Sequence, residues 1–307
     1  MPFPGPLFER VASAPPVPRG LPMVIVLTGF TDAGSAVSRT VQYFRESLDP
    51  TPLAVFGNDS LLDYRARRPI IEFEEDHLTD YAPQRLELSL VHDAGGSPFL
   101  LLAGYEPDFG WEAFAAAVVD FADSYGASTV TWVHAIPMPV PHTRPLGTTV
   151  SGTRTALTEQ HSVWKPHTRV PATVGHLIEY RFAQAGAQVA GFVLLVPHYL
   201  ADTEFPAAAL AALDSLSAAT GLSFDGDELR EENRGYLMKV EEQVSESDEL
   251  SRMVETLEER YDSYMAGSTS ATPMIHTGDL PSAEELAAEL ERFLATRPTN
   301  EDDKRRG

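Results

Sequence analysis

Four short strings hold most of the residues that could do chemistry, and each lies close to a short apolar run. They are Asp63-Tyr64-Arg65-Ala66-Arg67-Arg68-Pro69, Gly104-Tyr105-Glu106-Pro107, Pro141-His142-Thr143-Arg144-Pro145 and Val196-Pro197-His198-Tyr199. Short continuous apolar runs are typical of buried strands. Open α/β sheets bind ligands at the edge where their parallel strands end. The strings therefore predict a polar site at the carboxyl ends of the sheet strands.

Two kinds of function fit these residue types. Arginine and histidine can hold carboxylate or phosphate groups, so the site could bind a small anionic ligand or a partner protein without turnover. Alternatively, the chain is an enzyme of the phosphorylase or hydrolase type. In that case Glu106 or His142 is the acid or base, and Arg68 or Arg144 orients the anion.

The strand-to-helix turn Thr28–Ser35 adds two more candidates, Gly29 and Asp32. A helix N-terminus can hold an anion, although Asp32 or Ser35 could instead cap the helix. The turn lacks the lysine of a Walker motif and the third glycine of a dinucleotide fingerprint, so we expect no nucleotide cofactor. The full set of candidate ligand-binding residues is Gly29, Asp32, Arg68, Glu106, His142, Arg144 and His198.

Three histidines near predicted strand ends, His134, His142 and His198, raise the question of a metal. None has the close His-to-His spacing of a metal-binding motif, so we expect no metal site. His142 with Arg144 is more typical of an anion or carbonyl site.

The composition limits the partners. The 307 residues are 43% hydrophobic, enough for one large α/β domain and an appendage. The net charge of −22 argues against nucleic acid or an anionic membrane. No run approaches the length of a membrane span, and the absence of cysteine fits the cytoplasm.

The order of elements predicts an extended arm over residues 1–22 and an α/β core over 23–222. Strands are expected at 23–27, 53–56, 99–103, 129–135 and 189–196, with helices ending near Leu48, Tyr125 and Ala185. Gly126 is the expected stop of the second of these helices. Segments 61–74 and 84–92 are expected to pair as a hairpin inserted at about 61–92, because Leu86, Leu88 and Leu90 alternate with other residues.

The last part of the chain, residues 223–296, is expected to be helical and acidic. One apolar stripe contains Leu250, Met253, Val254, Leu257, Tyr261 and Tyr264. A second contains Leu286, Leu290, Phe293 and Leu294 and follows the capping box Ser282–Glu285. We expect a loop at 266–281 and a frayed tail at 297–307. The stripes are expected to pack on the core, or alternatively to form a lid over the site.

Taken together in this order, the strings and the Leu27–Gly34 turn resemble the proteasome-assembly-chaperone type 2 family, in its two-domain bacterial branch. The resemblance runs from about Leu21 to Met265. It implies a three-layer αβα core with a mixed, mainly parallel sheet, like that of purine nucleoside phosphorylases and related hydrolases. It also implies a helical C-terminal region near a ligand cleft, assembly into trimers, and no established reaction.

Eukaryotic members of that family act partly through a C-terminal hydrophobic-Tyr-x tail, whereas this chain ends Asp303-Lys304-Arg305-Arg306-Gly307. A chaperone role by that route is therefore not expected. An exposed hairpin leaves unpaired strand edges, which proteins usually cover. A neighbouring subunit in a closed ring could cover them and meet the cluster Arg65–Arg68, so we expect a homotrimer.

Overall fold

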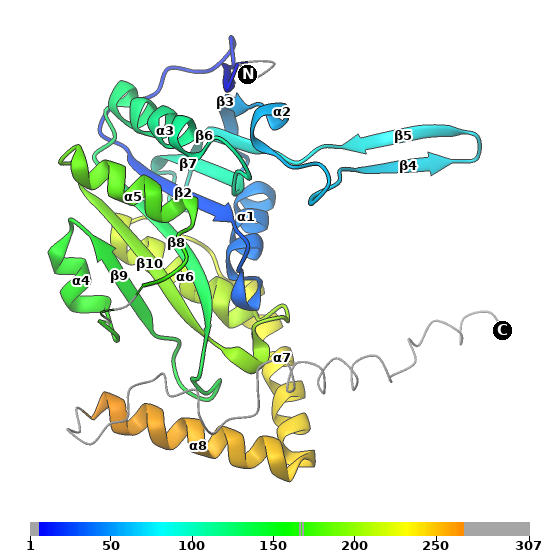
Figure 1. Cartoon of the computed structure of the whole chain (residues 1–307), viewed down its shortest axis with the longest axis vertical. Helices are drawn as coiled ribbons and strands as arrows, with labels where there is room; N and C mark the ends of the chain where they lie inside the picture. The colour runs from blue at the N-terminus through cyan, green and yellow to red at the C-terminus, as the bar shows by residue number, and fades with distance from the viewer. Residues whose placement is uncertain (1–5, 166, 168, 267–307) are drawn as a thin grey trace.

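A single eight-stranded sheet organises the molecule, shown in Figure 1 as a computed structural model that describes residues 6–165, 167 and 169–266. The strand order is β1-β3-β6-β7-β2-β8-β10-β9. Its strands are β1 (Phe8–Arg10), β2 (Pro22–Thr28), β3 (Thr51–Phe56), β6 (Leu86–His92), β7 (Pro98–Tyr105), β8 (Thr129–Met138), β9 (Thr148–Gly152) and β10 (Val189–Pro197).

The centre of the sheet is parallel. β2 lies between β7 and β8 and is parallel to both, with Ile25 opposite Leu102 on one side and Trp132 on the other. β10 continues the parallel set beside β8. β6, β3, β1 and β9 pair antiparallel with their neighbours. The predicted mixed, mainly parallel core is confirmed.

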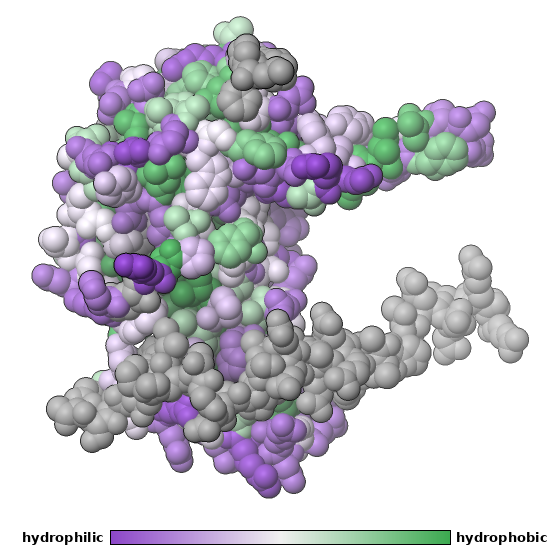
Figure 2. All heavy atoms as spheres, viewed as in Figure 1, coloured by the Kyte–Doolittle hydropathy of each residue, from purple (hydrophilic) through white to green (hydrophobic). Residues whose placement is uncertain are grey.

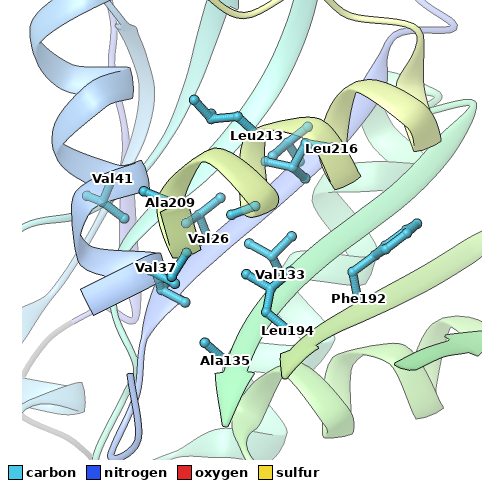
Figure 3. Packing of buried hydrophobic residues seen from close by; sticks show 14 of the residues in the cluster. Val26, Val37, Val41, Val133, Ala135, Phe192, Leu194, Ala209, Leu213 and Leu216 are labelled. Atoms are coloured by element: carbon cyan, nitrogen blue, oxygen red, sulfur yellow. The ribbon is translucent and has the colours of Figure 1, made fainter. Parts of the chain in front are cut away.

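Helices cover both faces, which makes the three layers that were predicted (Figure 1). One face packs on α1 (Ala36–Ser47) and α6 (Pro206–Thr220), and Figure 3 shows apolar side chains of both helices, such as Val37 and Ala209, gathered over Val26 and Val133 of the sheet. The other face packs on α3 (Trp111–Tyr125) and α5 (Val174–Gln184). Gly126 ends α3 in the left-handed region, at φ 65°, as predicted.

The inserted hairpin is shorter than predicted. β4 (Ile70–Glu74) pairs with β5 (His77–Ala82) as a separate two-stranded sheet that projects from the body (Figure 1). The prediction that segment 84–92 pairs with 61–74 is wrong, because β6 lies inside the main sheet between β3 and β7. Ser89 and Val91 are buried as well as the leucines, so the alternation did not mark a half-exposed strand.

The chain ends its described part in two helices, α7 (Asp227–Glu246) and α8 (Asp248–Met265). Met253, Val254 and Leu257 of the predicted stripe are buried. The second stripe, its capping box, the expected loop beyond Ala266 and the tail lie outside the described residues. The short elements are η1 (Ala33–Ser35), α2 (Asn58–Leu61), α4 (Thr155–His161) and η2 (His198–Leu200). No helix in the described part has the length and apolar character needed to cross a membrane.

Candidate functional site

The strands that precede the candidate residues point the same way, so their carboxyl ends share one edge of the sheet. β7 is followed by Glu106, β2 by Gly29, β8 by the loop with His142, and β10 by His198. The string Asp63–Pro69 joins this edge through Arg67, whose Nη2 donates to the Glu106 carbonyl at 2.6 Å. The four strings therefore lie along one edge of the sheet.

Glu106, which directly follows β7, is 6% exposed, and its carboxyl group lies against the N-terminus of α5. Its Oε1 accepts from the Val174 backbone N–H at 2.6 Å. A Cβ on Gly29 would lie 2.8 Å from Oε2, so the carboxyl group needs glycine there. Burial raises the pKa of Glu106, while hydrogen bonds from the Val174 and Phe30 backbone oppose the shift.

The pocket beside Glu106 is small. It has a volume of about 10 Å³ and is also lined by Gly29, His134 and Thr173. This is the size of one water molecule, not of a metabolite. Asp32, His142, Arg144 and His198 do not line it.

The buried His134 lies beside the partly buried His176, a neighbour that the sequence did not reveal. Burial lowers the pKa of His134 to about 4, with a further contribution from His176, so the ring is neutral near pH 7. His176 completes a capping box with Thr173 at the start of α5 and packs edge-on against Trp132. A histidine in place of glutamate at the third helical position hides this box from a motif search.

Both carboxylate oxygens of Asp32 accept hydrogen bonds from the backbone of α1. Its Oδ1 accepts from the Val37 N–H at 2.7 Å and its Oδ2 from the Ser38 N–H at 2.8 Å. The capping alternative therefore accounts for both carboxylate oxygens.

His142 lies beneath the C-terminal helices beside Tyr199, and is 8% exposed. Its Nδ1 is 2.7 Å from the Tyr199 hydroxyl oxygen, which also accepts from the His142 backbone N–H at 2.8 Å. Burial lowers the pKa of His142 and of His198. Within the described part of the chain, Nε2 of His142 and Nδ1 of His198 are buried without a hydrogen-bond partner.

The guanidinium group of Arg144 binds two carboxylates of α8. Its Nε and Nη2 donate to the two carboxylate oxygens of Asp262 at 2.9 and 2.8 Å, and its Nη1 lies 3.2 Å from Glu258 Oε1. The Tyr261 hydroxyl donates to the Pro145 carbonyl at 3.1 Å. These contacts join α8 to the loop after β8, so Arg144 positions a helix in this structure.

Of the clustered arginines, Arg67 contacts the strand ends. It pairs with Asp108, and its guanidinium lies 5.2 Å from the centre of the Tyr105 ring. Arg68, which the sequence singled out, is exposed and forms no ion pair with a described residue. The described residues also contain no group of three or more His, Asp or Glu side chains that could hold a metal.

The fold and these contacts define an α/β protein with a helix-covered carboxyl edge and an inserted hairpin. The chain belongs to the PAC2 family, whose model matches residues 26–244. A Corynebacterium glutamicum protein of unknown function has a TM-score of 0.82 and 33% identity over 85% of this chain and 99% of its own. A Mycobacterium tuberculosis protein of unknown function has a TM-score of 0.79 and 37% identity over 87% of this chain and 95% of its own.

A more distant relative shows the same fold. A Mycobacterium tuberculosis proteasome-assembly chaperone homologue has a TM-score of 0.69 and 22% identity, over 76% of this chain and all of its own (100%). No curated protein is detectably similar in sequence.

Proposed function

We propose that this protein is a cytosolic, self-associating binding protein that forms a ring of three subunits and binds a protein or small-molecule partner at the carboxyl edge of its sheet. The observation that carries the self-association is the hairpin β4–β5. The absence of cysteine fits a reducing compartment.

The hairpin exposes apolar side chains that a free surface rarely keeps. Phe73 and Leu78 are direct cross-strand partners, and Ile71 shares the face of Phe73, two residues away. Phe73 is 71% exposed and Leu78 is 60% exposed. Figure 2 shows hydrophobic surface along the arm and hydrophilic surface at its tip. Exposed apolar patches of this kind mark interaction sites.

The charges of the hairpin favour a second copy of the chain as its partner. Residues 69–84 contain no lysine or arginine and five carboxylates, Glu72, Glu74, Glu75, Asp76 and Asp80. Arg65 and Arg68 are exposed near the base of the same arm. An acidic arm can meet the arginines of a neighbour, and such a head-to-tail contact closes into a ring. The family resemblance favours three subunits.

The binding role is supported by the kind of proteins that share the fold. One such neighbour is a proteasome-assembly chaperone homologue, which is consistent with a protein partner for this chain. A ligand site under α8 is supported by His142 and His198, because Nε2 of the first and Nδ1 of the second have no hydrogen-bond partner among the described residues. In this proposal, the helical region from about residue 223 covers the site. The enzyme alternative has less support, because Arg144 already has partners and the pocket at Glu106 has the size of one water molecule.

The test is light scattering on the full chain and two variants. We expect the wild type at micromolar concentration to have three times the chain mass, and the double variant Phe73→Ser with Leu78→Ser to be a folded monomer. Met238→Ser is the matched control, because Met238 is equally exposed, at 68%, but lies on α7. A monomeric wild type would refute the self-association, and an unchanged oligomer in the double variant would remove the hairpin from it.

A further inference from the structure

A second pocket lies at the carboxyl ends of β2 and β7, on the side that α1 covers. It has a volume of about 460 Å³, within the range of small-molecule sites. The residues that matter for its chemistry are Thr28, Ser38, Gln42, Arg45, Glu46 and Arg85. It shares no lining residue with the pocket at Glu106.

Two arginines from distant parts of the chain meet in this pocket. Arg45 comes from the last turn of α1, and Arg85 directly precedes β6. The Arg45 Nη2 donates to the Arg85 carbonyl oxygen at 3.2 Å. Gly104 of β7 fixes the backbone of Arg85, since a Cβ on Gly104 would lie 2.2 Å from the same carbonyl oxygen. The Arg85 backbone, which accepts the hydrogen bond from Arg45, is therefore packed against β7.

The charge of these guanidinium groups is only partly compensated. Glu87 Oε1 lies 3.7 Å from Arg85 Nη1, which is a loose ion pair. Glu46 also lines the pocket, and its Oε1 accepts from Gln42 Nε2 at 3.1 Å. Burial lowers the pKa of Arg45, Glu87 opposes the shift, and the positive charge of Arg85 adds to it. The two like charges thus lie close enough to repel, in a chain where acidic residues outnumber basic ones by 45 to 23.

We propose that this pocket binds the phosphate or carboxylate group of a small organic anion between Arg45 and Arg85. A bound oxyanion would accept from both guanidinium groups and remove their repulsion. Ser38, Gln42 and Thr28 offer neutral polar groups beside them. This site lies at the foot of the hairpin, where β5 leads into Arg85, and apart from His142; it does not depend on self-association.

The experiment is isothermal titration calorimetry of the full chain at low ionic strength, with inorganic phosphate and with succinate as separate probes. We expect saturable binding of at least one probe, and a loss of affinity of about tenfold or more in Arg45→Gln and in Arg85→Gln, which is ~1.4 kcal/mol. The probe that binds more tightly identifies the group. Binding should weaken as salt is added.

Arg230→Gln is the matched control, because Arg230 is also exposed and paired with one carboxylate, Asp227, but lies on α7. Arg230→Gln should bind as the wild type does. The Arg85 side chain is 69% exposed and loses only the loose pair with Glu87, so Arg85→Gln is expected to fold. Equal affinity in Arg85→Gln and the wild type, or no saturable binding of either probe, would overturn the proposal.

Discussion

Arg144 and Asp262 are separated by 118 residues, yet their side chains form two hydrogen bonds of 2.9 and 2.8 Å. The pair ties the loop after β8 to α8, which covers the buried ring of His142. The guanidinium group of Arg144 holds the pKa of Asp262 below its usual value. The pair is therefore one of the contacts that hold α8 over the end of the sheet.

Replacing Arg144 with glutamine should loosen α8 without unfolding the core. The change removes both hydrogen bonds to Asp262 and the contact with Glu258. We expect faster amide hydrogen exchange along α8, while α3 keeps the exchange rates of the wild type. Arg181→Gln is the control, since it breaks an ion pair with Glu112 between α3 and α5. Unchanged exchange in α8 would show that apolar packing alone holds the helix.

Low pH should loosen α8 by the same route. The folded pKa of Asp262 is lowered from 3.8, so its pairing stabilises the covered state above that value. The contribution is lost as the pH falls through the lowered pKa. In hydrogen exchange between pH 5 and pH 3, corrected for intrinsic rates, the wild type should approach the Arg144→Gln variant. A constant difference between the two proteins across this range would contradict the prediction.

Replacing Gly29 with alanine should destabilise the protein by about 1–3 kcal/mol, the usual cost of overpacking. The new Cβ would lie 2.8 Å from the Glu106 Oε2, and the Oε1 of that carboxyl group is already held by Val174. Urea unfolding measures the loss. Gly235→Ala is the control: no atom lies within 4 Å of the place its new methyl group would take, and alanine favours a helix. Equal stability of the two variants would mean that Glu106 can move aside.

Acid should destabilise the fold through His134. Its folded pKa is lowered from 6.5 to about 4, so the unfolded chain takes up the proton first as the pH falls. The stabilisation by the neutral ring is complete above pH 6.5 and is lost between 6.5 and 4, by up to about 3 kcal/mol. Urea unfolding at pH 7.5, 6 and 5 should show a smaller loss in His134→Gln than in the wild type. Parallel pH profiles for the two proteins would rule out this group as the cause.

Two deletions should distinguish the contribution of the hairpin to folding from that of the main sheet. Removing residues 70–82 takes away only β4 and β5, which pair with each other. Removing residues 70–88 also takes Leu86 and Leu88, which are buried between β3 and β7. Thermal unfolding followed by circular dichroism should show a cooperative transition for the first deletion and its loss for the second. A cooperative unfolding transition in the second deletion variant would mean that the fold does not need β6.

The strand ends were predictable because local features determine them. The apolar runs that became β2, β7, β8 and β10 end where polar strings begin, and Gly126 marks the end of α3. The place of β6 was not predictable in this way, because alternating leucines fit both a projecting hairpin and a strand beside β7. Only the pairing partners decide between these alternatives.

The contents of the site depended on long-range contacts. From the sequence, Arg144 and Asp32 both indicated an anion site. In the structure, Arg144 is paired with Asp262 and Asp32 binds the backbone of α1. Arg45 and Arg85 were missed because neither belongs to a motif and 40 residues separate them. Spacing along the chain identifies the edge of the sheet, but it cannot tell which charges are already neutralised there.

The two legs of the hairpin are both anchored on the segment 104–108. The first leg is held by the Asp63 N–H, which donates to Asp108, and by Arg67, which donates to the Glu106 carbonyl. The second leg passes Arg85, whose carbonyl oxygen abuts Gly104. The hairpin is therefore attached to the body at the carboxyl end of one central strand, β7. A partner bound to the hairpin would therefore be connected to the backbone that carries Glu106 through these three contacts.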